Sequence, residues 1–103
     1  MKRIHVLLAD DHQIVLEGIR RILEKESGVE VVAEALDGRE AVSLAAALSV
    51  DVVFMDISMP NLNGIEATRQ ILRVKPDIKV VILSMHADKR FVERALKAGV
   101  WGY

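Results

Sequence analysis

The sequence predicts an α/β protein built on a doubly wound parallel sheet. Short apolar runs rich in β-branched residues alternate along the chain with longer segments whose apolar residues recur at helical spacing. A single helix between successive strands implies right-handed crossovers, and these give a parallel sheet with helices on both faces. Polar residues follow the strands at their carboxyl ends, which is the edge where open sheets of this kind bind ligands.

The first strand is predicted over residues 4–9 and the first helix over residues 12–26. The strand is an almost continuous apolar run, as expected for a strand that is buried on both faces. Gly28 follows the helix at a position where a left-handed backbone is common. Helical spacing places four apolar residues on one face of the helix: Val15, Ile19, Ile22 and Leu23.

The second strand is predicted over residues 29–35, at an edge of the sheet because two glutamates interrupt its apolar run. Asp37 and Glu40 have the spacing of a capping box, which predicts a second helix that starts after Asp37 and runs to about Ser49. Its inward stripe comprises Ala41, Leu44, Ala45 and Leu48.

The third strand lies within residues 50–57 and ends on Asp56, before a loop rich in Pro, Asn and Gly. Asn63 and Glu66 repeat the capping-box spacing and predict the start of a third helix. Gly64 is expected there either because its φ is positive or because its backbone approaches the site closely. The inward residues of this helix are Ile65, Thr68, Ile71 and Leu72.

A fourth strand is predicted over residues 78–83, followed directly by Ser84. Asp88 is then a candidate cap for a fourth helix, and residues 100–103 begin a fifth strand. The inward residues of the fourth helix are Val92, Ala95 and Leu96. With 103 residues and neither repeats nor linkers, residues 1–103 are predicted to form a single domain.

Composition excludes several classes of function. Lys and Arg number 14 against 15 Asp and Glu, so this segment is not expected to bind nucleic acid. The chain has no cysteine, which excludes a disulfide framework and a thiolate metal site. No apolar run approaches the ~18 residues of a membrane span, and no signal peptide is recognisable at the N-terminus. These features predict a cytoplasmic protein that does not associate with membranes.

Three carboxylates are predicted to meet at the carboxyl edge of the sheet. Asp10 and Asp11 follow the first strand, and Asp56 ends the third. Two unit charges ~4 Å apart repel by ~4 kcal/mol at an effective dielectric constant of about 20, so a raised pKa or a bound cation must compensate. Oxygen ligands of this kind favour Mg²⁺, and a carboxylate so placed can also act as a nucleophile that forms an aspartyl phosphate. The alternative for Asp11 is a role only as the N-cap of the first helix.

Five short motifs occur in order along nearly the whole chain. They are residues 8–12 (Leu-Ala-Asp-Asp-His), 55–60 (Met-Asp-Ile-Ser-Met-Pro), 63–64 (Asn-Gly), 83–86 (Leu-Ser-Met-His) and 95–103 (Ala-Leu-Lys-Ala-Gly-Val-Trp-Gly-Tyr). In these residues and their spacing the chain resembles the receiver domain of bacterial two-component response regulators, most closely the NarL/FixJ-type subfamily. The resemblance implies a flavodoxin-like receiver fold with strand order 2-1-3-4-5.

The resemblance also implies roles for the residues at the sheet edge. Asp56 would accept a phosphoryl group from a phosphohistidine on a sensor histidine kinase. Asp11 would bind Mg²⁺ directly and Asp10 mainly through a water molecule, while the backbone carbonyl of Ser58 would be a further ligand. Ser84 would supply the switch hydroxyl that turns to the phosphoryl oxygen, and Tyr103 the switch aromatic ring. The protein would then be a regulatory phosphoacceptor rather than a turnover enzyme.

Further expectations concern partners and chain length. The lysine that pairs with the phosphoryl group in this family would fall three residues beyond Tyr103, so the chain is expected to be a C-terminally incomplete fragment. The full-length protein would carry its own C-terminal DNA-binding domain and control transcription. An uncovered fourth strand would favour a homo-oligomer, in the simplest case a two-fold dimer that covers this strand. Exchange of the fourth helix and of residues 100–103 between subunits is one way to form such a dimer.

Two other functions remain open at this point. The site can be vestigial, so that the domain is a phosphorylation-independent interaction module. An aspartyl-nucleophile phosphatase also uses an aspartate at a strand end, but its pattern requires a second aspartate two residues later, where this chain has Ser58. A flavin-binding flavodoxin-like protein is disfavoured because Asp10 and Asp11 would repel the flavin phosphate.

Overall fold

A computed structural model of the chain describes residues 3–57, 59 and 61–83. Strands and helices alternate strictly through this part of the chain, which confirms the predicted α/β class. The elements are β1 (Ile4–Ala9), α1 (Gln13–Glu24), β2 (Val29–Ala35), α2 (Gly38–Ala47), β3 (Val52–Asp56), α3 (Gly64–Val74) and β4 (Lys79–Leu83). The predicted fourth helix and fifth strand lie outside the described residues.

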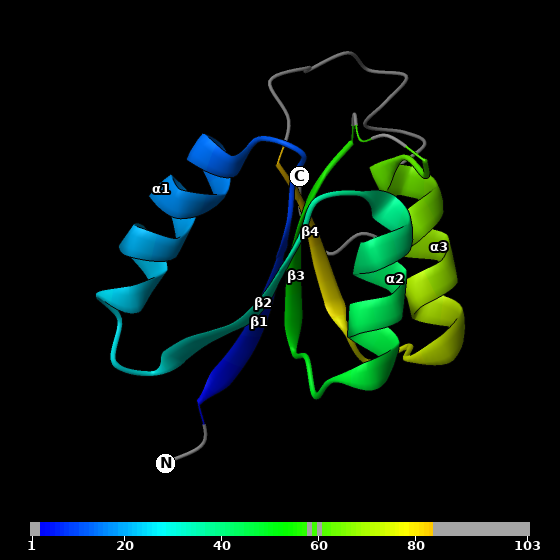
Figure 1. Cartoon of the computed structure of the whole chain (residues 1–103). Coiled ribbons are helices and arrows are strands. Elements are labelled where there is room, and N and C mark those ends of the chain that lie inside the picture. The colour runs from blue at the N-terminus through cyan, green and yellow to red at the C-terminus, as the bar shows by residue number, and fades with distance from the viewer. Residues whose placement is uncertain (1–2, 58, 60, 84–103) are drawn as a thin grey trace.

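The four strands form one parallel sheet in the order β2-β1-β3-β4. This order confirms the doubly wound prediction and places β2 at an edge, as expected from its glutamates. Figure 1 shows α1 on one face of the sheet and α2 and α3 together on the other. In the part of the chain that the structure describes, no helix combines the length and apolar character that a membrane span requires.

The core is divided by the sheet into two apolar clusters. Because successive strand residues point to opposite faces, alternate residues of β1, β3 and β4 pack toward α2 and α3. These residues are at most 3% exposed: Leu7, Ala9, Val53, Met55, Val80 and Ile82. On the other face Val6 and Leu8 pack against Leu16 of α1. Burial of each large side chain contributes about 1.5–3 kcal/mol.

The inward face of α1 differs from the prediction. Leu16 is the buried residue of this helix, and Ile19 and Leu23 pack beside it. Val15 and Ile22 were predicted to face inward, but they are 40% and 67% exposed. The helix is therefore rotated so that positions 16, 19 and 23 face the sheet, and part of its apolar surface lies outside the core.

The predicted inner faces of α2 and α3 are confirmed. Ala41 and Ala45 of α2 and Ile65, Thr68 and Ile71 of α3 are buried, while the predicted leucines of both helices pack at the margin of the same cluster. The Thr68 hydroxyl donates to the backbone carbonyl of Gly64 at 2.7 Å, so its burial leaves no unpaired hydroxyl.

The side chains at the predicted N-cap positions of α2 and α3 make capping hydrogen bonds. Asp37 and Asn63 accept hydrogen bonds from the backbone N–H groups of Glu40 and Glu66, at 2.7 and 2.9 Å. Neither motif is a complete capping box, because the Glu40 carboxylate accepts from Leu36 N–H at 3.1 Å and the Glu66 carboxylate pairs with an arginine one turn later. Capping-box spacing therefore located the helix starts correctly but not the return contacts.

The ends of α1 and α2 fall slightly before the predicted ones. The last helical residue of α1 is Glu24, two residues before the predicted end, and α2 ends at Ala47 instead of Ser49. Gly28 does not lie in the left-handed region. The turn after α1 is closed instead by hydrogen bonds from Glu26 N–H to Leu23 and from Val29 N–H to Glu26. The predicted left-handed role of Gly28 was therefore wrong.

Candidate functional site

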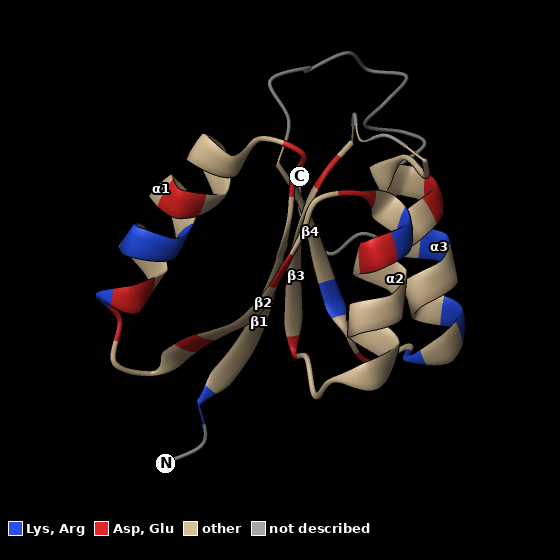
Figure 2. Ribbon diagram, in the orientation of Figure 1, with Lys and Arg blue, Asp and Glu red and all other residues tan. Residues whose placement is uncertain are grey.

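Asp10 and Asp56 lie side by side because their strands are neighbours in register. Ala9, the last residue of β1, pairs with Met55 of β3, and the two aspartates are the next residues along each chain direction. Both strands run the same way, so their carboxyl ends reach the same edge of the sheet. Figure 2 shows acidic residues at the ends of β1 and β3 on this edge.

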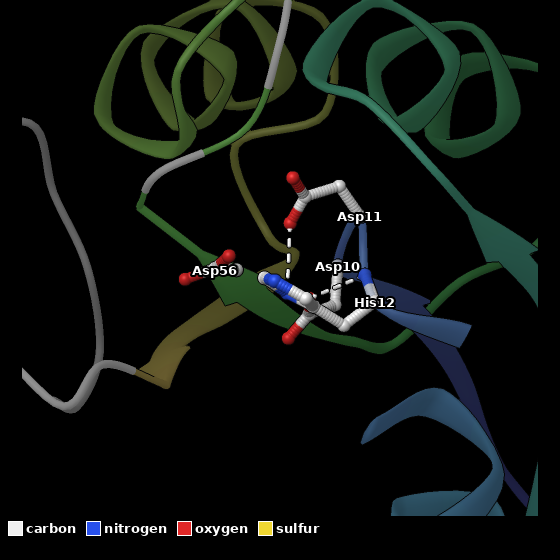
Figure 3. A group of neighbouring side chains, drawn as sticks. All are labelled: Asp10, Asp11, His12 and Asp56. Atoms are coloured by element: carbon white, nitrogen blue, oxygen red, sulfur yellow. Dashed lines mark hydrogen bonds and ion pairs between the residues drawn. The ribbon is translucent and has the colours of Figure 1, made fainter. Parts of the chain in front are cut away.

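Asp11 and His12 complete a cluster at this edge. One ligand-type atom from each of Asp10, Asp11, His12 and Asp56 lies within 4.8 Å of the others. Figure 3 shows the three carboxylates around the imidazole ring of His12. The structure thus brings together all three acids that the sequence predicts to meet, and it adds a histidine to them.

Hydrogen bonds fix Asp10 at the base of the cluster. Asp10 is 8% exposed, and its backbone N–H donates to the carbonyl of Ala35 at 3.1 Å. Its Oδ1 accepts from the backbone N–H of His12 and also lies 2.9 Å from His12 Nδ1. Asp10 is therefore held by β2 on one side and by the start of α1 on the other.

Asp11 does not cap α1. The N-cap of this helix is His12, whose side chain makes no capping hydrogen bond. The Asp11 Oδ1 lies instead 3.0 Å from His12 Nδ1 within the cluster. The alternative that Asp11 serves only as a helix cap was therefore wrong, and its carboxylate belongs to the acidic edge.

The His12 imidazole contacts two acids of the cluster, Asp10 and Asp11. The hydrogen bond to Asp10, followed by the charge of Asp11, raises the pKa of His12 above its ordinary value of 6.5. The sequence predicted no role for His12, and its position directly after two aspartates was the signal available.

The donor set fits a divalent cation of the Mg²⁺ type. Carboxylate oxygens are the protein ligands that this ion prefers, and it commonly takes one or two of them together with water and phosphate oxygens. Asp11 is exposed and Asp56 is half-buried, so oxygens from two different elements can be reached from solvent. The geometry can therefore hold a cation between Asp56 and the end of β1.

Gly64 approaches the backbone of Asp56 closely. A Cβ atom on Gly64 would overlap the carbonyl oxygen of Asp56 and lie 2.9 Å from its carbonyl carbon. The Gly64 N–H donates to the carbonyl of Ile57 at 2.9 Å. Of the two explanations predicted for Gly64, close approach is the one confirmed. The start of α3 thus packs directly on the residue that ends β3.

Three predicted site residues lie outside the described residues: Ser58, Ser84 and Tyr103. Their assigned roles stay predictions. Asn61, which the sequence analysis did not single out, has a φ of 67°. Asparagine is one of the few residues that adopt this left-handed conformation routinely, so the Asn-rich loop was the available signal.

Comparisons with known proteins agree on one family. The sequence model of a family described as "Response regulator receiver domain" matches residues 6–103. Among curated proteins, the chain is 46% identical over 101 residues to the transcriptional regulatory protein DegU of Brevibacillus brevis. That match covers 98% of this chain and 43% of DegU, so the chain spans less than half the length of this relative.

Solved structures show the same fold. The signal receiver domain of the response regulator NarL from Mycobacterium tuberculosis, described as putative, aligns with a TM-score of 0.94 at 31% identity. The alignment covers 99% of this chain and 82% of that one. RcsB from Salmonella enterica serovar Typhimurium, solved on promoter rprA in the presence of the phosphomimetic BeF₃⁻, aligns with a TM-score of 0.87 at 32% identity. That alignment covers 97% of this chain and 84% of RcsB.

Proposed function

This chain belongs to the receiver domains of two-component response regulators, and we propose that residues 1–103 form one such domain whose phosphoacceptor is Asp56. The observation that carries the proposal is the cluster of Asp10, Asp11 and Asp56 at one edge of the sheet. Asp56 is half-buried at the end of β3, where a phosphoryl donor can approach from solvent.

The proposed reaction is transfer from a kinase phosphohistidine to Asp56. A carboxylate oxygen of Asp56 attacks phosphorus, the bond from phosphorus to the histidine nitrogen breaks, and an aspartyl phosphate forms. Asp56 contributes the nucleophile, and the close packing of Gly64 on its backbone carbonyl limits its movement. Asp10, fixed by β2 and α1, holds the other side of the site. The product regulates an effector, so the domain is a phosphoacceptor rather than a turnover enzyme.

Asp11, Asp10, Asp56 and the backbone carbonyl of Ser58 are the proposed Mg²⁺ ligands, with Asp10 acting mainly through water. Bound Mg²⁺ would supply positive charge that neutralises the transferred phosphoryl oxygens. The support is the carboxylate donor set and its access to solvent. His12, whose imidazole contacts Asp10 and Asp11, lies where a cation would have to compete with it.

Removing the Asp11 carboxylate should remove most of the stabilisation by Mg²⁺. At about 100 times its dissociation constant, a ligand that binds only the folded state raises the free energy of unfolding by ~2.7 kcal/mol. We expect this gain in the wild type and little of it in Asp11→Asn, measured by urea unfolding with and without Mg²⁺. Asp77→Asn, an exposed acid between α3 and β4, is the control and should keep the full gain. An equal gain in Asp11→Asn would exclude Asp11 as a ligand.

The start of α1 is the proposed docking surface for the sensor kinase. Ile14 is 84% exposed and Val15 40%, only a few residues after the acidic cluster. An apolar pair beside a reaction site suits a partner helix that must bring its phosphohistidine to Asp56. Both residues lie outside the core, and this exposure supports the proposed surface.

A charged residue at position 14 should slow phosphotransfer from the kinase but not from a small phosphodonor. Ile14→Lys is expected to slow transfer from the kinase about tenfold or more, because a buried apolar contact of about 1.5–3 kcal/mol is lost. The reaction with a small phosphodonor should keep its wild-type rate, as measured by intact mass over time. Val74→Lys makes the same change at a 61% exposed position on α3 and should affect neither reaction. Loss with both donors in Ile14→Lys would indicate misfolding instead.

The proposed output is control of an effector in the cytoplasm, in most cases transcription. DegU is named as a transcriptional regulatory protein, and the RcsB structure contains promoter DNA. Both relatives support a C-terminal DNA-binding domain in the full-length protein. The receiver segment itself is proposed to bind no nucleic acid, because its formal net charge is −1.

A homodimer is part of the same proposal. β4 is an end strand of the described sheet, and its residues Val81 and Leu83 are only half-buried. Pairing of this edge with a second copy would cover both its backbone groups and these side chains. Light scattering at micromolar concentration should give twice the monomer mass. A stable monomer with a cooperative melt would contradict the dimer.

A further inference from the structure

The N-terminus of α2 contacts Asn61 and Leu62, which lie between Asp56 and α3. The two carboxylate oxygens of Asp37 have different partners: Oδ1 accepts from Glu40 N–H at 2.7 Å, and Oδ2 accepts from the Asn61 side-chain amide at 2.9 Å. The bond to Glu40 and then the bond to Asn61 lower the pKa of Asp37 below its ordinary value. One residue therefore caps its own helix and ties a loop that lies 24 positions away.

Gly38 makes a second contact between α2 and the loop that contains Asn61. A Cβ atom on Gly38 would overlap the carbonyl oxygen of Leu62 and lie 2.7 Å from its carbonyl carbon. The backbone of the loop thus lies directly on the first residue of α2, and Figure 1 shows the first turns of α2 and α3 side by side. Asn61, with its φ of 67°, is the residue whose side chain reaches across.

The start of α3 contacts the end of β3. Gly64 packs on the Asp56 carbonyl, and its N–H donates to Ile57 at 2.9 Å. Asn61 and Leu62 are therefore held by Asp37 and Gly38, and Gly64 is held by the backbone of Asp56 and Ile57.

We propose that Asp37 is a positioning residue of the phosphoacceptor site, acting through its hydrogen bond to Asn61. This inference rests on the proposed role of Asp56. Asp37 does not touch the reacting atoms; it restricts the position of Asn61, which lies between Asp56 and α3. This hydrogen bond raises the fraction of molecules in which Asp56 and its surroundings are arranged for transfer.

Two variants remove the hydrogen bond between Asp37 and Asn61, called here the tie, while keeping the local fold. Asp37→Ser retains a good N-cap for α2, but its single hydroxyl cannot serve Glu40 and Asn61 together. Asn61→Gly retains a residue that tolerates positive φ but deletes the amide. The control is Lys75→Met, which removes a side-chain hydrogen bond of 2.7 Å to the Leu48 carbonyl, a bond that joins the end of α3 to the end of α2.

The expected result is a loss of rate without a loss of Mg²⁺ binding. In the full-length protein, both tie variants should react with a small phosphodonor about two- to tenfold more slowly, as for one net hydrogen bond. Lys75→Met should react at the wild-type rate. The double variant Asp37→Ser/Asn61→Gly should be no slower than the slower single one, because both changes break the same bond. Wild-type rates in the single variants, or effects that multiply in the double one, would overturn the proposal.

Hydrogen exchange of the Gly64 amide tests the tie without any phosphodonor. Both variants should exchange this amide about two- to tenfold faster than the wild type, while the Glu40 amide stays protected. Unchanged Gly64 exchange would overturn the positioning role. A wild-type protein that takes up no phosphate, with faster Gly64 exchange in the variants, would instead overturn the proposed function and leave the positioning of the loop intact.

Discussion

Asp56→Asn is expected to abolish phosphate uptake completely. Incubation of the wild type with a small phosphodonor and Mg²⁺ should add a single phosphate, seen as a mass increase of the intact protein. The amide of asparagine has nearly the same shape as the carboxylate, but its oxygen is a far weaker nucleophile. Because the substitution also removes one of three neighbouring negative charges, the variant should fold at least as stably as the wild type.

Asp77→Asn is the matched control for this experiment. It removes an equally acidic group near the opposite end of the sheet, before β4 begins, and should take up phosphate normally. A phosphate that persists in Asp56→Asn would place the acceptor elsewhere. No phosphate on the wild type under any condition would favour a phosphorylation-independent interaction module with a vestigial site.

Gly64→Ala is expected to destabilise the protein strongly. Its Cβ would overlap the Asp56 carbonyl oxygen and lie 3.0 Å from the Cα of Ile57, so backbone rather than a flexible side chain would have to move. The cost should reach about 3 kcal/mol or more, at the upper end of the overpacking range. Since small domains have only ~5–15 kcal/mol of stability, urea unfolding should show a large shift of the midpoint.

Gly18→Ala gives the opposite expectation for the same chemical change. Gly18 lies inside α1, and a Cβ added there meets nothing within 4 Å. The variant should be more stable than the wild type by about 0.5–1 kcal/mol, because alanine loses less backbone entropy in a helix. Equal midpoints for the two variants would show that Gly64 does not need its close approach to Asp56.

The acids of the site could be predicted because they depend on topology alone. Parallel strands bring their carboxyl ends to one edge, so residues that follow β1 and end β3 must meet if the strands are neighbours. Asp10, Asp11 and Asp56 needed no knowledge of side-chain rotamers. Strand and helix positions were similarly accessible, since each rests on local periodicity and on a nearby Asp, Asn or Gly.

The inward face of α1 could not be predicted because its apolar arc is wider than its buried face. Ile14, Val15 and Leu16 are consecutive apolar residues, and periodicity alone fits either Val15 or Leu16 as the inward position. The choice is made by packing against Val6 and Leu8. Two of the apolar residues left outside, Ile14 and Val15, form the proposed kinase surface, so a surface residue and a core residue can share the same sequence pattern.

The contact of Asp37 with Asn61 could not be predicted from the sequence for a different reason. It joins residues 24 positions apart and exists only because α2 and α3 lie side by side on one face. No local pattern reports such a pair. The position of His12 among the acids likewise depends on a side-chain rotamer, which the residue order Asp-Asp-His does not specify.

The parallel order of the strands also determines at which stage of folding the acidic site can form. The three pairings between β1, β2, β3 and β4 all join distant residues: Ile4 pairs with Val29, Val52 with Lys79, and Val6 with Val52, 46 positions later. None of these three pairings is a local hairpin, so loop-closure entropy must be overcome before any of them forms. During synthesis β1 emerges first, yet its inner neighbour β3 follows only after α1, β2 and α2. Asp10 and Asp56 therefore meet only when β1 and β3 pair at the centre of the sheet.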